Sequence, residues 1–310
     1  MKKKFLIGSR GSRLALAQSG QVLAALQEAF PERRFELVQI KTTGDNILDV
    51  SLSKIGDKGL FTKEIEKELL AGAIDLAVHS MKDMPVKLPD GLKIGAATER
   101  LNPRDALIAK KGKRLGDLKA GDTIATGSLR RKAQLLAFNP GLNIVDIRGN
   151  VQSRIKKMND DPAIDATILA CAGLERLNMM DIITEIIPED VITPAVSQAS
   201  LAIEIRENDQ AAEELAASLN HPNSMAAVSC ERAFLSELGG GCQVPIAGLA
   251  KVGGGRITLT GMVASVDGRE IYRGSMSGSV ENFASIGKGL AKKLMAEGAD
   301  KILKTLFNRF

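Results

Sequence analysis

Arginines are the side chains of this sequence best suited to binding an anion. Arg10 and Arg13 lie between a short apolar segment and a helical pattern, and Arg130 and Arg131 occupy the corresponding place in the second hundred residues. Helix N-termini present unpaired N–H groups and a positive dipole end, and guanidinium groups bind carboxylates with two hydrogen bonds. The spacing predicts sites for a ligand with several carboxylates, although solvated surface charges would have the same spacing. Arginines that follow other strand-like segments are Arg148, Arg154 and Arg176.

Lys82 and Asp83 come soon after the apolar segment 74–78, where a strand would end. Open α/β sheets bind ligands beyond the carboxyl ends of their strands, so we expect both side chains to face a ligand. An ionised Asp83 would stabilise a cationic intermediate, and a protonated one would act as an acid. The alternative is that Asp83 caps the turn before Met84 and Pro85.

The three cysteines differ in their settings. Cys242 follows three glycines, where the backbone can approach another molecule closely and leave the thiol accessible. A buried, inert thiol is the ordinary alternative for a lone cysteine, and this interpretation fits Cys171 and Cys230. Because the sequence has no C-x-x-C and only His79 and His221 as histidines, it predicts neither a disulfide framework nor a metal site. We expect His79 to be structural.

Composition narrows the class of protein. The 310 residues carry 42 Lys and Arg against 37 Asp and Glu, a net charge of +5, and 44% of them are hydrophobic, as in ordinary folded proteins. Aromatic residues make up only 3% and tryptophan is absent, so platforms for stacking nucleic-acid bases are scarce. No apolar run approaches the ~18 residues of a membrane helix, and Arg10 and Arg13 interrupt any signal peptide. We therefore expect a cytoplasmic protein.

The elements that position these residues alternate between strands and helices. The pattern predicts strands at 5–7, 35–41 and 74–78, with helices at about 14–30, ended by Pro31, and at 62–70. This βαβα rhythm favours a mostly parallel sheet with helices on both faces. Residues 45–59 lack clear periodicity and are expected to form a mobile loop.

The second hundred residues repeat this opening. Residues 123–131 resemble the first strand and its Gly/Ser loop, and 163–170 resemble 73–78. The repeat predicts two similar α/β lobes, with chance similarity among small apolar strands as the alternative. Beyond residue 221 the pattern changes to a helix, two strands and a long helical stretch, which indicates a third, α+β domain. The expected domains are 1–98 with 200–220, 99–199, and 221–310.

Six short motifs are spread along the chain: His79-Ser-Met-Lys-Asp-Met-Pro, Gly127-Ser-Leu-Arg-Arg, Ile147-Arg-Gly-Asn, Gly239-Gly-Gly-Cys-Gln-Val-Pro, Lys58-Gly-Leu-Phe-Thr-Lys-Glu and Pro103-Arg-Asp-Ala. Together they resemble the porphobilinogen deaminase family, also called hydroxymethylbilane synthases. They occur in the family's order and cover almost everything from Arg10 to Pro245. Each motif alone is weak, whereas the set is highly specific.

The resemblance implies an α/β fold of two lobes like type II periplasmic binding proteins, with mixed sheets, plus a small α+β C-terminal domain. It implies a transferase of tetrapyrrole (heme) biosynthesis that condenses four porphobilinogen molecules head to tail and releases ammonia and linear hydroxymethylbilane. We expect a monomer, because no coiled coil or exposed apolar stripe in the sequence argues for assembly. It also implies a dipyrromethane cofactor, joined through a thioether to Cys242, which serves as the primer. No nucleic-acid or membrane partner is implied.

The match to the family also implies roles for individual residues. Asp83 would lie against the pyrrole N–H and stabilise the azafulvene cation formed as ammonia leaves. The residues expected to hold the carboxylates of cofactor and substrate are Arg10, Ser12, Lys82, Thr126, Ser128, Arg130, Arg131, Arg148, Arg154 and Arg176. Those expected in a lid and in stacking are Lys54, Lys58 and Phe61.

Some positions depart from the family's usual residues. Gly127 replaces a serine, Asp57 replaces a glycine, and Ser197 and Ala199 replace glycines, which would restrict a hinge. A non-catalytic two-lobed binding protein for an anionic ligand is the alternative function. It accounts for lobes and arginines, but not for Asp83 together with a cysteine presented by glycines. A nucleic-acid binder is a more distant alternative.

Overall fold

A computed structural model describes residues 2–46, 59–240 and 244–307. These residues form two compact units: unit 1 comprises 2–46, 59–101 and 199–225, and unit 2 comprises 102–198 and the described part of 226–307. Cys242, Lys54, Lys58 and most of the expected loop at 45–59 lie outside the described residues. The expected division into three domains remains a prediction.

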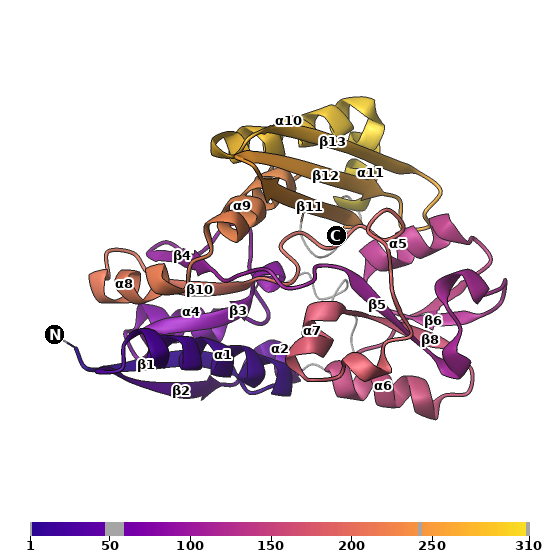
Figure 1. Ribbon diagram of the computed structural model, residues 1–310. Coiled ribbons are helices and arrows are strands. Elements are labelled where there is room, and N and C mark those ends of the chain that lie inside the picture. Colours follow the sequence, from indigo (N-terminus) through magenta and orange to yellow (C-terminus); the bar gives the residue numbers. More distant parts are fainter. Residues whose placement is uncertain (1, 47–58, 241–243, 308–310) are drawn as a thin grey trace. The chain divides into compact units, whose positions relative to one another are not determined.

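Unit 1 is built on a five-stranded sheet with the order β2-β1-β3-β10-β4 (Figure 1). Its strands are β1 (Lys4–Arg10), β2 (Arg34–Ile40), β3 (Leu76–Ser80), β4 (Leu92–Ala97) and β10 (Leu201–Arg206). β1 pairs in parallel with β2 and β3, whereas β10 is antiparallel to both β3 and β4. The mostly parallel sheet expected from the βαβα rhythm is therefore wrong, because β10 returns from far along the chain in the opposite direction. The mixed sheet implied by the family resemblance is correct.

Two faces of this sheet carry separate apolar cores. Leu26 of α1 (Arg13–Ala29) and Leu215 of α8 (Gln210–Leu219) pack with one face, and Ile65 and Leu69 of α4 (Lys63–Leu70) pack with the other. Two short elements complete the unit, α2 (Thr43–Asn46) and the 3-10 turn η1 (Met81–Asp83). Side chains of β3 alternate between the faces, so Val78 joins the α1 core while Ala77 joins the α4 core.

Unit 2 contains a second five-stranded sheet with the order β7-β6-β8-β5-β9. Its strands are β5 (Asp105–Ala109), β6 (Thr123–Ala125), β7 (Asn143–Val145), β8 (Ala166–Ala170) and β9 (Glu185–Ile186). β6 is parallel to β7 and β8, and β5 is antiparallel to β8 and β9. This repeats the pattern of the first sheet, so the sequence repeat does reflect two lobes of similar topology.

One hydrogen-bond pattern recurs in both sheets and explains part of the repeat. Asp75 accepts the N–H of Leu6 through Oδ2 at 2.9 Å, and Asp165 accepts the N–H of Thr123 through Oδ2 at 2.8 Å. Each aspartate therefore satisfies a backbone donor on the neighbouring parallel strand. The repeated Ala-Ile-Asp sequence has the same structural role in each lobe.

The rest of unit 2 comprises short helices and an antiparallel sheet. Around the second sheet lie α5 (Leu129–Phe138), α6 (Val151–Asp160), α7 (Cys171–Arg176), and the 3-10 turns η2 (Lys110–Gly112), η3 (Leu115–Asp117) and η4 (Met180–Ile182). The C-terminal part comprises α9 (Pro222–Glu237), which begins in unit 1 and continues into unit 2, followed by β11 (Ile246–Gly253), β12 (Arg256–Ala264), β13 (Ile271–Ser279), η5 (Val280–Asn282), α10 (Phe283–Leu294), the π-helical η6 (Met295–Ala299) and α11 (Asp300–Phe307). Phe234, Leu259, Leu290 and Leu303 share one core there, as expected for an α+β domain.

Ser197 and Ala199, two of the departures from the family's usual residues, have left-handed backbones. Their φ angles are +64° and +83°, a region that glycine adopts freely and that costs other residues about 1–2 kcal/mol. The Ser197 N–H donates to the buried Glu231 carboxylate at 2.5 Å, which holds this conformation. Glycine would therefore fit both positions without strain, at the point where the chain passes from unit 2 to unit 1.

Candidate functional site

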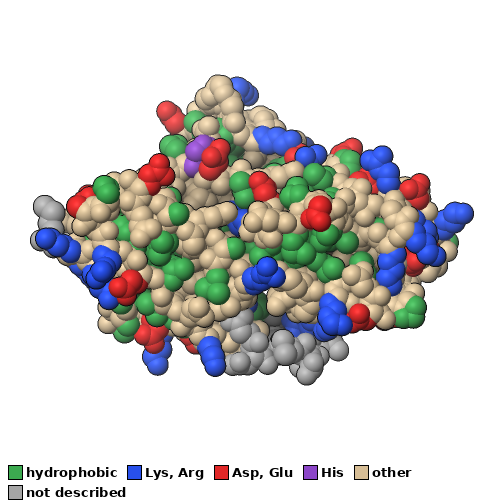
Figure 2. All heavy atoms as spheres, turned by 60° about the horizontal axis from the view of Figure 1, so that its bottom comes forward, with side chains coloured by type: hydrophobic (Ala, Val, Ile, Leu, Met, Phe, Trp, Pro, Cys, Tyr) green, Lys and Arg blue, Asp and Glu red, His purple; other side chains and the backbone are tan. Residues whose placement is uncertain are grey.

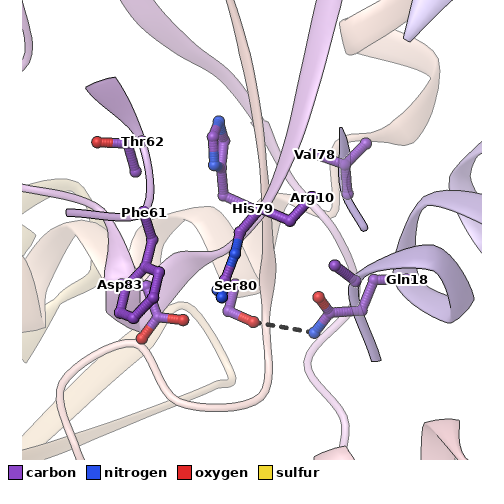
Figure 3. A pocket seen from close by; sticks show the side chains of 9 residues that line it. Arg10, Gln18, Phe61, Thr62, Val78, His79, Ser80 and Asp83 are labelled. Carbon is purple, nitrogen blue, oxygen red and sulfur yellow. Dashed lines mark hydrogen bonds between the residues drawn. The ribbon is translucent and has the colours of Figure 1, made fainter. Parts of the chain in front are cut away.

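A pocket opens at the carboxyl end of β3 in unit 1, where the sequence predicted a ligand (Figure 3). Its lining residues come from β1, α1, β3, η1 and the segment before α4: Arg10, Ala15, Gln18, Phe61, Thr62, Val78, His79, Ser80 and Asp83. Gln18 Nε2 donates to Ser80 Oγ at 2.9 Å, which joins α1 to the end of β3. Three predicted site residues, Arg10, Phe61 and Asp83, thus lie in one pocket.

Asp83 is held at this pocket by the turn that follows β3. Met81 is buried, and its N–H donates to the carbonyl of Ser200 at 3.0 Å. The Met84 N–H donates to the Met81 carbonyl at 3.2 Å, so a backbone carbonyl closes the turn. Within the described part of the chain the Asp83 carboxylate makes no hydrogen bond. The exposed Asp83 carboxylate is therefore available to a ligand, and the turn does not depend on it.

The Arg10 guanidinium stacks on the ring of Phe61, with its carbon 4.0 Å from the ring centroid. A cation over an aromatic face is favourable, and the contact aligns the planar guanidinium at the pocket. Ser12 is the N-cap of α1, and its Oγ accepts the N–H of Ala15 at 3.2 Å. Lys82 lies beside Asp83 on η1 and is partly exposed. Unit 1 therefore presents cationic groups and a carboxylate near one strand end.

In unit 2, two helices begin at the edge where parallel strands β6 and β7 end. Ser128 caps α5 by accepting the Arg131 N–H at 3.4 Å, and Thr126 Oγ1 accepts the Ser128 N–H at 3.3 Å. Asn150 caps α6. The two loops touch, because a Cβ at Gly127 would lie 3.2 Å from the carbonyl oxygen of Ile147. Gly127 therefore permits the close approach of two helix N-termini.

Arg130 and Arg131 are buried and share one carboxylate. Arg130 Nη2 lies 2.8 Å from Asp105 Oδ2, and Arg131 Nη2 lies 2.7 Å from Asp105 Oδ1. Gln198 also donates to Asp105, at 2.9 Å. Burial alone would raise the pKa of Asp105, but the two guanidinium charges and these hydrogen bonds hold that pKa well below its ordinary value. The cluster keeps one positive charge in excess.

Further arginines of unit 2 add donors at the same edge. Arg131 Nε and Arg148 Nη1 are buried, and neither has a hydrogen-bond partner among the described residues. Arg154 Nε donates to the carbonyl of Gly149 at 2.7 Å. Burial lowers the pKa of Arg176 to about 10, so the group is still a cation at neutral pH. Buried donors without acceptors are costly, so an anion that reached Arg131 Nε or Arg148 Nη1 would be bound favourably.

The sequence matches two family models. Residues 5–214 match the cofactor-binding domain of porphobilinogen deaminase, described as its dipyromethane cofactor binding domain, and residues 225–296 match the C-terminal domain of the same enzyme. The chain belongs to the porphobilinogen deaminase family. This makes it a transferase of tetrapyrrole biosynthesis that carries a dipyrromethane-binding domain.

Full-length relatives in this family are highly similar. Porphobilinogen deaminase of Moorella thermoacetica is 52% identical over 298 residues, which cover 96% of this chain and 95% of that protein. The enzyme of Syntrophomonas wolfei is 50% identical over 297 residues, covering 96% and 97%. Among solved structures, the methionine-binding protein MetQ aligns with a TM-score of 0.45 at 15% identity, over 70% of this chain and 88% of that one.

The residues of unit 2 fit a dipyrromethane. Each pyrrole carries an acetate and a propionate, and a carboxylate is the kind of acceptor that the buried Arg131 Nε and Arg148 Nη1 lack. The excess positive charge around Asp105 is also opposite in sign to the carboxylates of a dipyrromethane. The donor set of the structure therefore agrees with the family's cofactor.

Several residues of the sites were not predicted from sequence, among them Asp105, Gln18 and Ser80. Asp105 belongs to the motif Pro103-Arg-Asp-Ala, but nothing in its neighbours along the chain signals two arginine partners. Gln18 and Ser80 line the pocket, and an uncharged pair has no sequence signal of its own.

The thiols of Cys171 and Cys230 are buried, and burial raises their pKa to about 11 and about 12, which confirms them as inert.

The surface charges, the helix lengths and the grouping of possible metal ligands bear on which partners this protein could bind. On the face drawn in Figure 2, Lys and Arg side chains are interspersed with Asp and Glu. Within the described ranges, no helix is both long and apolar enough to span a membrane. The same ranges contain no cluster of His, Cys, Asp and Glu that could hold a metal ion.

Proposed function

We propose that this chain condenses four porphobilinogen molecules head to tail on a dipyrromethane joined to Cys242 through a thioether. Overall, four porphobilinogens and one water give one hydroxymethylbilane and four ammonia molecules. The bound dipyrromethane supplies a nucleophilic pyrrole end to which the first substrate couples. The family match over nearly the whole chain supports this proposal.

The pocket of Asp83 carries the catalytic part of the proposal. As ammonia leaves, the substrate becomes an electron-poor cation, and a carboxylate held beside it lowers the energy of that charge. Asp83 lies in a pocket with Arg10 and Phe61, so a carboxylate, a cation and an aromatic face meet there. In our proposal Asp83 stabilises the cation, Arg10 and Lys82 bind substrate carboxylates, and Phe61 stacks near the rings.

The arginines of unit 2 carry the binding part. Their proposed role is to hold the acetates and propionates of cofactor and growing chain, with Thr126 and Ser128 at the N-terminus of α5. Arg131 and Arg148 have buried donors to offer, and Arg130 and Arg131 both pair with the Asp105 carboxylate. Ser12, Arg154 and Arg176 complete the proposed set. Lys54 and Lys58 are proposed lid residues that lie outside the described ranges.

Ammonia release tests this function directly. Purified protein incubated with porphobilinogen should release one ammonia for each porphobilinogen consumed, with consumption followed by the Ehrlich reaction. Mass spectrometry should detect one linear tetrapyrrole for every four substrates. A non-catalytic binding protein for an anionic ligand would deplete free porphobilinogen at most stoichiometrically and release no ammonia.

The remaining expectations belong to the same proposal. We propose that the enzyme acts as a cytoplasmic monomer without nucleic-acid or membrane partners, and that its domains are 1–98 with 200–220, 99–199, and 221–310. The three separate sheets support three folding domains, with the second and third sheets both in unit 2.

A further inference from the structure

A buried group of titratable side chains lies against the pocket of unit 1. His79 comes from β3, Glu204 from β10 and Glu66 from α4, and their exposed fractions are 5%, 0% and 5%. Pairing of β3 with β10 places Glu204 opposite Ala77, whose side chain joins the core under α4. His79 is two residues from Ala77 and shares its face, so all three groups lie between the sheet and α4.

Several polar atoms of this group have no hydrogen-bond partner among the described residues. His79 Nε2 lies 3.0 Å from Glu204 Oε2. Glu204 Oε1 and Glu66 Oε1 are buried and have no hydrogen-bond partner among the described residues. The other ring nitrogen of His79, Nδ1, likewise makes no hydrogen bond to any described residue. These unpartnered oxygen and nitrogen atoms are therefore positions at which the group can bind or release a proton.

Electrostatics requires the group to hold at least one proton. Two ionised carboxylates buried together would repel each other and lose their hydration. Burial and the nearby Glu204 raise the pKa of Glu66, against the opposing effects of Thr62, His79 and Lys63. Lys63 belongs to the same helix as Glu66, and Arg10 and Asp83 line the adjoining pocket. One imidazole and two carboxylates thus share a small number of protons.

Two residues that line the pocket, His79 and Thr62, connect the pocket to the carboxylates of Glu204 and Glu66. His79 lines the pocket and contacts Glu204, while Thr62 lines the pocket one helical turn before Glu66, whose N–H donates to the Thr62 carbonyl at 2.8 Å. Figure 3 shows the imidazole of His79 pointing away from the Asp83 carboxylate. The pocket therefore has two separate acidic sides, with Asp83 on one and the buried group on the other.

We propose that Glu66, Glu204 and His79 form one proton-sharing unit, the acid–imidazole cluster, which accepts the proton released at each condensation. This rests on the proposed function. Each condensation breaks the C–N bond of the incoming substrate as ammonia leaves, forms one carbon–carbon bond and breaks one C–H bond at the growing end. The electron pair of that C–H bond returns to the pyrrole ring, and the proton passes to the cluster and then to solvent, where the released ammonia binds it.

The members of the cluster have different roles. In the accepting state His79 donates its Nε2–H to Glu204, which leaves the lone pair on Nδ1 free for the incoming proton. The resulting imidazolium is paired with the Glu204 carboxylate. Glu204 is thus a positioning residue that fixes the tautomer and strengthens the base. Glu66 is a second positioning residue, which holds or yields a proton as the charge of the pair changes.

Histidine NMR tests the cluster without reference to turnover, because His79 and His221 are the only histidines. In ¹⁵N-histidine-labelled, cofactor-loaded protein, Glu204→Gln should move the titration midpoint of His79 to lower pH by about 1 unit or more, since a neighbouring anion is lost. Glu66→Gln should also move the His79 resonances, because one carboxylate of the cluster is lost. His221 should titrate identically in every variant. Glu68→Gln, at a glutamate of the same helix α4 that lies outside the cluster, is the matched control and should leave His79 unchanged.

The pH dependence of turnover then links the cluster to the reaction. The acid limb of the kcat profile should move in Glu204→Gln by the same amount and direction as the His79 midpoint. A His79 midpoint that Glu204→Gln leaves in place would overturn the cluster. A midpoint that moves while the kcat profile stays fixed would overturn its role in catalysis. Absence of ammonia release from the wild type would instead contradict the proposed function, and the NMR result would still decide the cluster.

Discussion

Replacing Asp83 by asparagine is expected to lower kcat by about a hundred- to a thousandfold, the usual loss when one preorganised electrostatic group is removed from a reacting centre. Asparagine keeps the shape of the side chain but removes the charge that faces the cationic substrate. The fold should be unaffected, because the turn is closed by the Met81 carbonyl and Asp83 is exposed. The rate should be measured as ammonia release per molecule that carries the cofactor by intact mass.

Asp90→Asn is the matched control for this variant. Asp90 is an exposed aspartate of the same unit and does not line the pocket. It should retain the wild-type kcat. If Asp83→Asn also turned over at close to the wild-type rate, the assignment of the pocket as the catalytic centre would be wrong.

The largest expected effect on stability comes from Asp105→Asn. The variant leaves Arg130 and Arg131 buried without their shared anion, and breaking a buried ion pair from one side costs about 3–5 kcal/mol. Chemical denaturation should show this loss in full in cofactor-free protein. In cofactor-loaded protein the loss should be smaller, because cofactor carboxylates would compensate the two guanidinium groups. Equal losses in the two forms would count against cofactor binding by this arginine pair.

The Asp105 carboxylate should also make the free energy of unfolding depend on pH. The native pKa of Asp105 lies well below its ordinary value of about 4, so the folded protein binds that proton less readily than the unfolded chain. The stabilisation is therefore complete above about pH 4 and is lost as the pH falls toward the native pKa. Between pH 5 and pH 3 the wild type should lose more free energy of unfolding than Asp105→Asn. Parallel curves for the two proteins would contradict this.

Local pattern was enough to predict the elements that begin each lobe. The first helix ends at Ala29, just before Pro31, and the repeated Ala-Ile-Asp sequences mark the matching strands β3 and β8. These signals depend on residues close together in the chain. The antiparallel strand β10 was not predicted, because its pairing with β3 joins segments more than a hundred residues apart.

The site shows the same division between local and distant information. Asp83 was found because it follows a strand end, which is a local signal. Arg130 and Arg131 were assigned wholly to a ligand, since their protein partner Asp105 lies 25 and 26 residues upstream. His79 was expected to be only structural, and its contact with Glu204 depends on a pairing 125 residues apart. Buried charge networks therefore need the fold before they can be recognised.

Intact mass spectrometry of the purified protein beside its Cys242→Ser variant tests the central claim most directly. The wild type should exceed the mass of its sequence by one dipyrromethane, either as purified or after incubation with porphobilinogen. The variant should have the mass of its sequence under both conditions. An unmodified wild type after that incubation would contradict the account and leave a two-lobed binding protein that lacks the chemistry.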